Sequence, residues 1–399
     1  MKILFLNHNL IWRGTFFRCL GFARELVRQG DEVYLWTTAR EIDAGGSRFS
    51  IDGVKVWQTP RWRPVSGHDG GYALVDNLAR LIRASWNSWD VIHAFDHRPN
   101  VLLPWLWMRA RRRIAPRDRR TLFVSDWCDW WAGGGITTAR RRFAFIDRWE
   151  QKIEEGSKRI SDGVTVISSA LHERALRAGV EPNRLLTLPS GVAIERFPAM
   201  DRDECRKQLG LPLLAPILGF VGFSLWDMGL LAEAFSHIKK EIPEAVLLVV
   251  GGGVEEKEKE IFRQRFQTGQ DVFLPGAVPF EEIPCYLGAC DVQLLPLENN
   301  LANQARIPNK LFDYYASGRP VAASDVGDAA AYIREHQTGL AGGTDALSLA
   351  ESAINLLRNP IFAGECGDRA RIMAEKKFAF SALTSVLSSF YNGLMNAMI

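Results

Sequence analysis

Three ionisable residues, Arg306, Lys310 and Asp313, lie close together around a predicted helix start. Pro308 suits the first turn of a helix, because the missing N–H of proline costs nothing there. The backbone amides of Asn309 to Leu311 would then point outward from the positive end of the helix. Such an end can bind phosphate, and Arg306 or Lys310 would add positive charge. The alternative is an ordinary solvated helix face for the two cations and for Asp313.

The residues that follow predict a corner of a parallel α/β sheet. Apolar residues recur at helical spacing over positions 311–316, and Gly318 ends that helix. Positions 320–323 are typical of a short buried strand. Asp313 is therefore expected near the carboxyl end of this strand, where open α/β sheets bind ligands.

Two polar segments in the first half of the chain also follow predicted strands. The first covers positions 93–99 and contains two histidines, of which His97 is favoured over His93 as a functional group. The alternative for His97 is a plain surface histidine.

The second segment covers positions 125–135 and combines two carboxylates, three tryptophans and a glycine run. Asp126 and Asp129 can accept hydrogen bonds from the hydroxyl groups of a ligand. Trp127 or Trp130 can stack on an apolar ring face. Packing of the tryptophans beneath a long loop is the alternative.

Strand and helix patterns alternate along the whole chain, which predicts parallel sheets covered by helices. The expected strands fall into two series separated by a Pro- and Gly-containing passage, with a linker near 189–198. The first series is 3–7, 33–37, 54–58, 91–94, 122–125 and 164–167; the second is 217–221, 245–250, 272–274, 292–295 and 320–323.

Composition divides the chain in the same place. With 399 residues, 47% of them hydrophobic, the chain is long enough for two domains that each bury a core. Residues 1–198 carry 31 Lys and Arg against 21 Asp and Glu, whereas residues 199–399 carry 18 against 25. Twelve of the 13 tryptophans precede residue 151, which suggests that the first half of the chain has an unusual surface.

Several classes of protein are disfavoured by the sequence. The six cysteines form no CxxC pairs, so we expect reduced, mostly buried thiols and no metal site. No apolar run is long enough for a membrane span, and the opening MKILFLNHNL turns polar too soon for a secretory signal, so a cytoplasmic location is expected. The basic residues match no nucleic-acid-binding motif.

One segment nevertheless suggests a membrane surface. Positions 100–108 are apolar and contain two tryptophans, and seven arginines follow between Arg109 and Arg120. Such a helix can dock on anionic lipid as a peripheral protein. A core helix with a solvated basic end is the alternative.

Six short motifs occur in an order that resembles glycosyltransferase family 4, the retaining, glycogen-synthase-like group 1 transferases. The motifs are VIS at 166–168, LPSGV at 188–192 followed by Phe197, FVG at 220–222, LVVG at 248–251, FLPG at 273–276 and DVQLLP at 291–296. The corner at 308–328 resembles the donor-sugar corner of the same family. The resemblance covers nearly the whole chain.

The resemblance implies a GT-B fold, with two Rossmann-like α/β domains and a cleft between them. Residues 1–190 would form an acceptor-binding domain, residues 191–378 a nucleotide-sugar-binding domain, and residues 379–399 a helix that crosses back to the first domain. The implied reaction transfers a sugar from a nucleotide-diphosphate donor to a glycan or lipid-linked acceptor. It retains the anomeric configuration and needs neither metal nor cofactor.

The resemblance also assigns roles to residues. His97 and Asp126 would be catalytic, and Asp129 with Trp127 or Trp130 would bind the acceptor. The donor would be bound by the family glycines at Gly14 and Gly222 and by the residues of the corner. These are Arg306, Asn309, Lys310 and Asp313, with Asp313 at the position of a family glutamate.

The sequence departs from the family pattern at three donor-site positions. An arginine and a lysine are expected after Gly222, but the chain has Phe223 and Met228, and Ala305 replaces the first family glutamate. We expect Arg306 and Lys310 to supply the missing charge. The rival hypotheses are a non-catalytic protein of the same fold that binds glycan or partners an active transferase, and a nucleotide-sugar epimerase.

Overall fold

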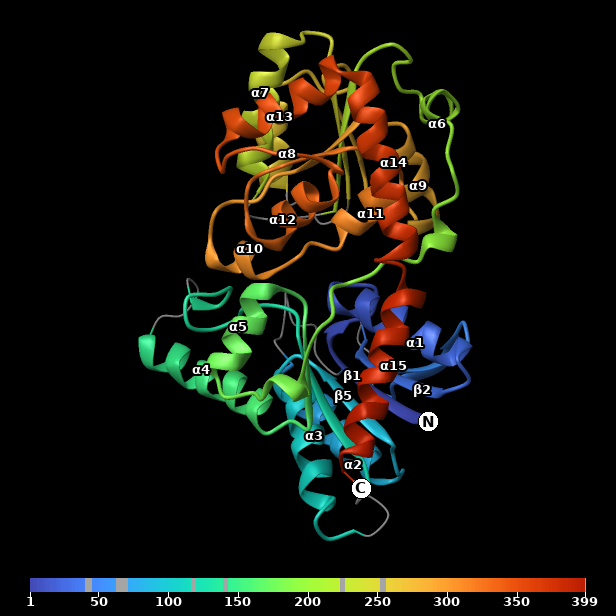
Figure 1. Ribbon diagram of the computed structural model, residues 1–399, viewed down its shortest axis with the longest axis vertical. Coiled ribbons are helices and arrows are strands. Elements are labelled where there is room, and N and C mark those ends of the chain that lie inside the picture. The colour runs from blue at the N-terminus through green and yellow to red at the C-terminus, as the bar shows by residue number, and fades with distance from the viewer. Residues whose placement is uncertain are drawn as a thin grey trace. The chain divides into compact units, whose positions relative to one another are not determined.

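The computed structural model describes residues 1–39, 45–61, 71–115, 120–138, 143–222, 227–251 and 256–398, with the side chains of 256–258 left out. The chain divides into two units. Unit 1 comprises Met1–Ser190 and Phe380–Ile399, and unit 2 comprises Gly191–Ala379. The last helix, α15 (Phe380–Asn396), thus belongs with the N-terminal elements (Figure 1).

Unit 1 is built on an eight-stranded sheet of order β3-β4-β2-β1-β5-β6-β7-β8. All neighbours pair in parallel except β3 and β4, which are antiparallel. The strands are β1 (Lys2–Leu10), β2 (Glu32–Thr38), β3 (Ser47–Ile51), β4 (Val54–Thr59), β5 (Val91–Phe95), β6 (Leu122–Trp127), β7 (Gly163–Val166) and β8 (Leu185–Thr187). The order reverses between β1 and β5, and ligands bind at such switch points in α/β sheets.

Helices cover both faces of this sheet. They are α1 (Thr15–Arg28), α2 (Leu74–Ser85), α3 (Pro99–Arg111), α4 (Ala144–Arg159) and α5 (Ser169–Arg177), besides α15. A core of β1, β5, α2 and α3 side chains holds Trp36, Trp57, Trp89 and Trp105. Core packing therefore explains part of the tryptophan bias in the first half, while Trp12, Trp86, Trp107 and Trp149 are exposed.

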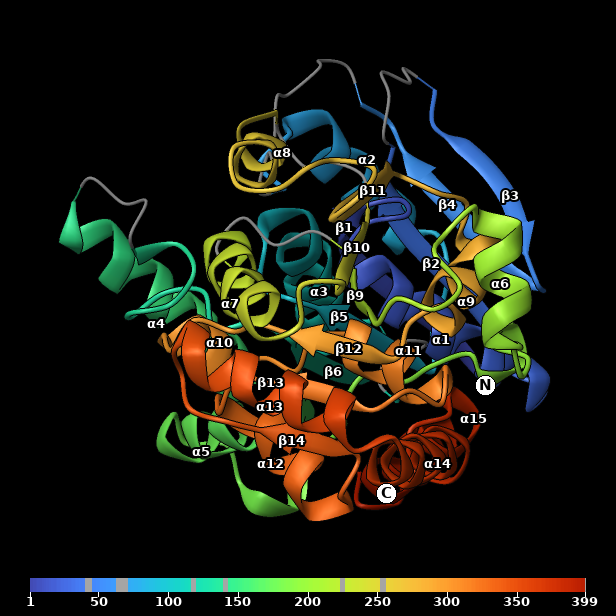
Figure 2. The same cartoon turned by 90° about the horizontal axis from the view of Figure 1, so that it is seen from above.

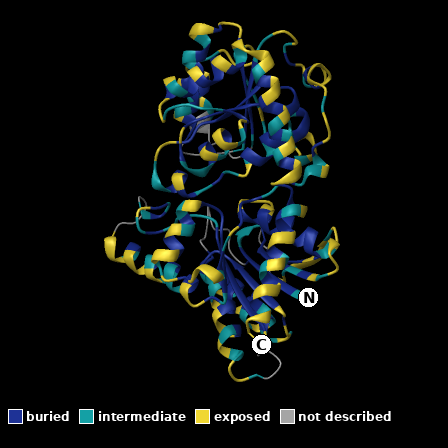
Figure 3. Ribbon diagram, viewed as in Figure 1, coloured by how far each residue is buried: buried dark blue, intermediate teal, exposed yellow. Residues whose placement is uncertain are grey.

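Unit 2 has a six-stranded parallel sheet of order β11-β10-β9-β12-β13-β14, whose order reverses between β9 and β12. Its strands are β9 (Ile217–Val221), β10 (Val246–Val250), β11 (Val272–Gly276), β12 (Val292–Leu295), β13 (Val321–Ala323) and β14 (Gly339–Ala341). The central strands β9, β10, β12 and β13 are buried, whereas the edge strands β11 and β14 are partly exposed (Figure 3).

The helices of unit 2 also form two layers. They are α6 (Arg202–Leu209), α7 (Met228–Glu241), α8 (Glu256–Arg263), α9 (Ile283–Gly288), α10 (Leu301–Ala305), α11 (Lys310–Ala316), α12 (Gly327–His336), α13 (Ala346–Arg358) and α14 (Pro360–Lys376). One hydrophobic cluster joins the sheet to α7 and α13, and a second joins it to α9, α11 and α14. Viewed from above, α7 and α9 lie on opposite sides of the strands (Figure 2).

The predicted doubly wound α/β fold is confirmed, but the sequence patterns missed three short strands. These are β3, β8 and β14, of which β3 is an exposed antiparallel edge strand without a buried face to reveal it. Five of the six cysteines are buried and all six are free thiols. Among the described helices, none combines the length and hydropathy that a membrane crossing requires.

Candidate functional site

The candidate donor corner lies in unit 2, at the switch point between β9 and β12. Strand β9 ends at Val221, and the next residue, Gly222, has φ of 88°, a conformation that side-chain-bearing residues rarely adopt. The Lys310 side chain covers this turn: a β-carbon on Gly222 would lie 3.7 Å from Lys310 Nζ. The same ammonium lies 3.7 Å from the ring centroid of Phe220. Lys310 therefore places a cation where the strand ends.

The Lys310 ammonium has an unusual environment. Within the described ranges, no carboxylate forms an ion pair with it. Burial and, to a smaller extent, the nearby Arg306 guanidinium lower the pKa of Lys310 to about 7, although Asp227 and Asp313 oppose the shift. A cation held in this way is poised to receive an anionic ligand.

Asp313 lies one turn further along α11 and is half-buried. Burial raises the pKa of its carboxyl group to about 7, and the attraction of Lys310 opposes this only in part. Lys310 and Asp313 therefore form a titratable pair at the corner. This position is compatible with the predicted contact to ribose hydroxyls.

The prediction that the backbone amides at the helix start are free to bind a ligand is wrong in part. The Leu311 amide donates to the Pro308 carbonyl at 3.0 Å, and the Phe312 amide donates to the Asn309 carbonyl at 3.0 Å. Helix α11 spans only seven residues and its first residue is Lys310. Asn309 is exposed. The side chain of Lys310, rather than a helix end, is thus the main positive group of the corner.

Arg306 is less available than the sequence suggested. Its Nη2 lies 3.3 Å from Oδ2 of the buried Asp227. Asp227 also accepts hydrogen bonds from the Glu298 amide at 3.1 Å and from the Asn303 side chain at 3.2 Å. The carboxylate therefore balances part of the Arg306 charge and fixes its position beside the corner.

The three departures from the family pattern have different structural settings. Met228 begins α7 and is buried in the core of unit 2, so this position cannot present a polar group to a ligand. Ala305 is also fully buried. Phe223 lies outside the described residues.

A second cluster lies in unit 1, at the switch point between β1 and β5. His8 is part of β1, and Asp96 and His97 directly follow β5. The Asp96 carboxylate lies between the two rings, with Oδ1 2.8 Å from His97 Nδ1 and Oδ2 3.5 Å from His8 Nδ1. Asp96 has φ of 87°, which is strained for a residue with a side chain. Such strain is concentrated at functional sites.

The charges of this cluster are mutually dependent. Burial alone would raise the pKa of Asp96, but His8 and His97 more than offset it and hold the pKa well below its ordinary value. Burial lowers the pKa of His8. Burial would also lower the pKa of His97, but Asp96 and Glu150 outweigh it and the net shift is upward. At pH values below the raised pKa of His97, the cluster therefore holds a carboxylate beside a protonated imidazole.

This charge state makes a testable prediction about pH. Because the pKa of His97 in the folded chain lies above its ordinary value of 6.5, the His97–Asp96 pair stabilises unit 1 fully below that value. The stabilisation is lost as the pH rises through the folded pKa. Imidazole NMR titration, with a His97→Asn variant to assign the signal, is expected to give a midpoint above 6.5. A midpoint below 6.5 would contradict the assigned charge state.

Trp131 closes one side of the cluster. The Arg98 guanidinium lies 4.0 Å from the Trp131 ring centroid, and Arg98 Nη1 donates to Glu150 Oε1 at 2.7 Å. The ring centroids of His8 and His97 lie 6.0 and 6.5 Å from that of Trp131. Trp131 itself is half-buried, so one aromatic surface remains accessible beside two histidines.

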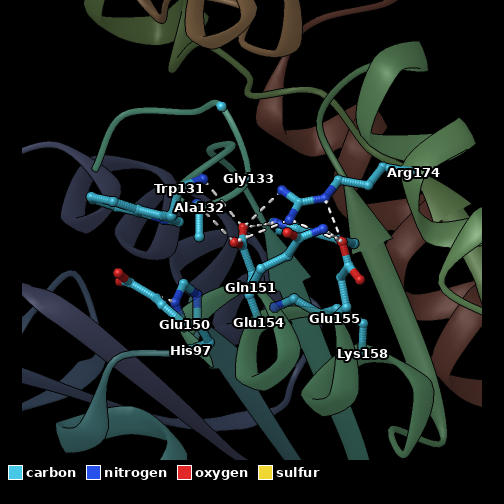
Figure 4. A network of polar contacts seen from close by, with 12 residues as sticks. His97, Trp131, Ala132, Gly133, Glu150, Gln151, Glu154, Glu155, Lys158 and Arg174 are labelled. Atoms are coloured by element: carbon cyan, nitrogen blue, oxygen red, sulfur yellow. Dashed lines mark hydrogen bonds and ion pairs between the residues drawn. The ribbon is translucent and has the colours of Figure 1, made fainter. Parts of the chain in front are cut away.

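The loop that carries Trp131 is anchored to α4 (Figure 4). The Glu154 carboxylate accepts hydrogen bonds from the amides of Trp131 at 3.2 Å and Ala132 at 3.0 Å, and also binds Arg174. The Gly133 amide donates to Asp147 at 3.1 Å. Buried carboxylates on one helix thus set the position of a glycine-rich loop.

The three neighbouring tryptophans have different environments. Trp127 is fully buried, its Nε1 donates to Glu154 at 2.8 Å, and the predicted stacking of Trp127 on a ligand ring is therefore wrong. Trp130 is half-buried and lies 4.3 Å from the Arg174 guanidinium. Asp129 is also half-buried. Trp130 and Asp129 stay candidates, but Trp131 is the tryptophan that faces the histidines.

The predicted catalytic role of Asp126 is wrong for a structural reason. Its carboxylate is completely buried and accepts hydrogen bonds from Arg18 at 2.8 Å and from Thr165 at 2.5 Å. Burial would raise the pKa of Asp126, but Arg18 outweighs it and lowers the pKa. Arg18 also donates to the Leu188 carbonyl at 2.8 Å. Asp126 is therefore a core ion-pair partner.

His93 and His97 are both buried but have different partners. His93 is fully buried and its Nδ1 lies 2.6 Å from the Tyr391 hydroxyl of α15, so it joins α15 to the sheet. Gly14 begins α1 with φ of 49°, and a β-carbon there would lie 2.5 Å from the Asn9 amide nitrogen. Local packing thus explains the glycine at position 14 without a ligand.

Sequence reasoning missed His8, Asp96, Arg98, Trp131 and Glu150. His8 and Asp96 follow two predicted strands that are neighbours in the sheet, and this adjacency was the available signal. Glu150 could not be found, because it reaches the cluster from a helix about 50 residues away in sequence. In the described part of the chain, no group of three His, Cys, Asp or Glu residues has the arrangement of a metal site.

Comparisons with known proteins match both halves of the chain to glycosyltransferases. Residues 215–359 match the family described as glycosyl transferases group 1, and residues 14–191 match the glycosyl transferase 4-like domain. A GDP-mannose-dependent alpha-(1-6)-phosphatidylinositol monomannoside mannosyltransferase of Mycobacterium tuberculosis is 26% identical over 84% of this chain and 96% of its own length. A D-inositol 3-phosphate glycosyltransferase of Rhodococcus erythropolis is 30% identical over 48% of this chain and 43% of its own length.

Solved structures extend the likeness in fold to nearly the whole chain. Sucrose-phosphate synthase from Thermosynechococcus elongatus superposes with a TM-score of 0.78 at 19% identity, covering 99% of both chains. Anabaena HepE in complex with UDP and glucose superposes with a TM-score of 0.70 at 17% identity, covering 98% of this chain and 99% of its own. The chain therefore belongs to the group 1, family 4-like glycosyltransferases of the GT-B fold, enzymes that use nucleotide sugars.

Proposed function

We propose that this glycosyltransferase moves a sugar from a nucleotide-diphosphate donor to a glycan or lipid-linked acceptor with retention of anomeric configuration. The observation that carries the proposal is the Lys310 ammonium, which lies beside the Gly222 turn at the switch point of unit 2. A diphosphate leaving group develops negative charge as the sugar departs, and a preorganised cation stabilises that charge. Lys310 would thus replace the cations missing at Phe223 and Met228.

The other residues of the corner would hold the rest of the donor. Asp313 would accept hydrogen bonds from ribose hydroxyls while its carboxyl group is ionised. Arg306 would add positive charge to that of Lys310, although Asp227 balances part of it. Gly222 would let the backbone approach the phosphates. In the retaining reaction, the leaving phosphate would itself help to deprotonate the acceptor, so no dedicated base is required of the chain.

Unit 1 would bind the acceptor at the cluster of His8, Asp96, His97 and Trp131. The half-buried Trp131 ring offers a stacking surface for a sugar, and Asp129 would accept hydrogen bonds from its hydroxyls. His97, held by Asp96, would contact the reacting sugar as a hydrogen-bond donor. No metal or cofactor enters the proposed reaction.

The relatives support the substrate classes without fixing them. One named relative is a GDP-mannose-dependent enzyme whose acceptor is a phosphatidylinositol mannoside, a glycolipid. One superposed structure contains UDP and glucose. These names favour a nucleoside-diphosphate hexose as donor. A cytoplasmic location, peripheral at the inner face of the membrane, is part of the proposal.

Release of nucleoside diphosphate from UDP-, GDP- and ADP-sugars, measured with glycan and lipid-linked acceptors, tests the proposed reaction. One donor is expected to be turned over only when an acceptor is present, and NMR of the product is expected to show the anomeric configuration of the donor. Turnover of a donor without any acceptor would favour the epimerase. The absence of both turnover and nucleotide binding would favour the non-catalytic protein.

Trp131→Ala is expected to raise the KM for the acceptor about fivefold, because a stacking contact contributes roughly 1 kcal/mol. The affinity for the donor is expected to stay unchanged, since Trp131 lies in the other unit. Steady-state kinetics with the active acceptor measure both values. Trp149→Ala, at an exposed tryptophan of α4, is the matched control. An unchanged acceptor KM in Trp131→Ala would remove Trp131 from the acceptor site.

A further inference from the structure

Helix α2 of unit 1 has its polar and apolar faces reversed with respect to an ordinary surface helix. Its buried side chains include Asp76, Asn77 and Arg80. Its outward side chains form an apolar stripe at successive helical turns. These are Leu74, Leu78 and Ile82 of the helix with Trp86 just beyond it, and between 48% and 71% of each is exposed.

Hydrogen bonds fix this orientation. Arg80 Nε donates to Asp76 Oδ1 at 2.7 Å, and Arg80 Nη1 donates to the carbonyls of Asn7 at 2.9 Å and Asn100 at 3.2 Å. The Asn77 side chain donates to the Gly71 and Ala73 carbonyls. Rotating α2 would strip these buried polar groups of their partners, which is costly. The apolar stripe is therefore held outward by the fold.

Helix α3 extends the exposed apolar surface. Trp107 Nε1 donates to Ser85 Oγ at 2.7 Å and Arg111 Nη1 donates to the Ser85 carbonyl at 2.9 Å, so α3 lies beside the end of α2. The α3 side chains divide into two sets: Val101, Trp105 and Met108 enter the core, whereas Leu103, Leu106 and Trp107 are exposed. The helix that the sequence predicted to dock on a membrane surface therefore exposes apolar side chains only on its outer side. Arg117 and Arg119 lie outside the described residues.

The charges beside this surface are mainly positive, although Asp162 pairs with Arg109 of α3 and with Arg112 just beyond that helix. Between residues 74 and 86 and between 99 and 115, the sole acidic residue is Asp76, which is buried against Arg80. Arg83 lies 5.5 Å from the Trp86 ring centroid, and burial followed by repulsion from Arg48 lowers the pKa of Arg83. Arg48 and Arg113 are exposed. An apolar stripe with tryptophans and a mainly basic border complements an anionic lipid surface.

We infer that α2 and the outer side of α3 form a docking face for anionic membrane lipid. The apolar stripe would enter the headgroup boundary, and the arginines would contact lipid phosphates. This inference concerns unit 1 alone and does not depend on sugar transfer. A lipid surface is favoured over a protein partner because the bordering charges are mainly positive and a bilayer requires no shape complementarity.

Vesicle flotation of the whole protein tests the docking face. The wild type is expected to float with vesicles of phosphatidylcholine and phosphatidylglycerol at low salt and to bind pure phosphatidylcholine much more weakly. The double variant Leu78→Gln with Ile82→Gln is expected to bind the anionic vesicles at least about tenfold more weakly, because it removes two inserted side chains. Arg48→Gln with Arg113→Gln is expected to lose about tenfold of the binding to anionic vesicles only.

The matched control is Leu347→Gln with Ile361→Gln, which changes two exposed apolar residues of unit 2. It is expected to bind vesicles like the wild type. Circular dichroism and nucleotide titration show whether each variant is folded and whether donor binding in unit 2 is intact. A failure of nucleotide binding therefore counts against the proposed reaction, whereas vesicle binding still tests the docking face.

Two results would overturn the inference. One is a wild type that does not float with anionic vesicles, or a Leu78 and Ile82 double variant that floats equally well. The other is concentration-dependent self-association in sedimentation without lipid that this double variant abolishes, which would assign the face to a second copy of the chain.

Discussion

Replacing Lys310 with methionine is expected to weaken the binding of the nucleotide diphosphate by about a hundredfold. Methionine keeps the unbranched, apolar stem beside Gly222 and Phe220 but removes the ammonium. A charge-assisted hydrogen bond to phosphate contributes roughly 1.5 to 3 kcal/mol, and this corner has few other cations. Isothermal titration of the nucleotide measures the loss. Lys240→Met, at an exposed lysine of α7, is the matched control.

The same lysine makes donor binding sensitive to pH. With a pKa of about 7, Lys310 is an ammonium below this value and largely neutral above it. Binding of a diphosphate is therefore expected to weaken as the pH rises above 7, by up to about tenfold for each pH unit. Lys310→Arg is expected to remove the part due to Lys310, because arginine stays charged.

Equal affinities of the wild type and Lys310→Met for every nucleotide that binds would contradict the assigned role. The donor phosphates would then have to be held by groups other than Lys310. An affinity for diphosphate that does not change between pH 6 and 9 would contradict the proposed titration of the corner.

Replacing Asp126 with alanine is expected to destabilise unit 1 by about 3 to 5 kcal/mol, the usual cost of removing one partner of a buried ion pair. Arg18 would be left buried opposite an empty space, and Thr165 would lose its acceptor. Denaturant unfolding followed by circular dichroism measures the free energy. Asp203→Ala, at an exposed aspartate, is the control and is expected to change stability by less than about 0.5 kcal/mol.

The pH dependence of this pair has a definite sign. The pKa of Asp126 is lowered in the folded chain, so its contribution to stability is present above the ordinary carboxyl pKa and is lost as the pH falls through the folded value. Wild-type stability that matches that of Asp126→Ala near neutral pH would show that the ion pair does not stabilise unit 1. Full stability with lost turnover in Asp126→Ala would restore the catalytic role predicted from the sequence.

Much of the fold could be predicted from the sequence because burial leaves a strong pattern. The parallel strands in the middle of both sheets are continuous apolar runs, and the helix at Thr15 follows a glycine turn. Edge strands carry no such pattern, which explains why β3 was missed. The exact start of α11 depends on a local turn at Pro308 that residue types alone did not reveal.

The site was harder to predict, because exposure and orientation depend on packing. Asp126 and Trp127 come at the end of a strand, where ligand-binding residues are common, but both side chains point into the core. Trp131 differs from Trp127 only by its place in a loop that Glu154 holds from α4. The apolar residues of α3 likewise divide between core and surface, and no pattern in the sequence separates them.

Titration of UDP, GDP, ADP and their sugar conjugates into the wild-type protein and Lys310→Met tests the central claim most directly. The account predicts that one nucleotide family binds selectively to the wild type, with an enthalpy signal that fades as the pH rises above 7 and is largely lost in Lys310→Met. If the folded wild-type protein binds none of these ligands, the chain does not use a nucleotide sugar at this corner, and the non-catalytic alternative replaces the proposed transfer.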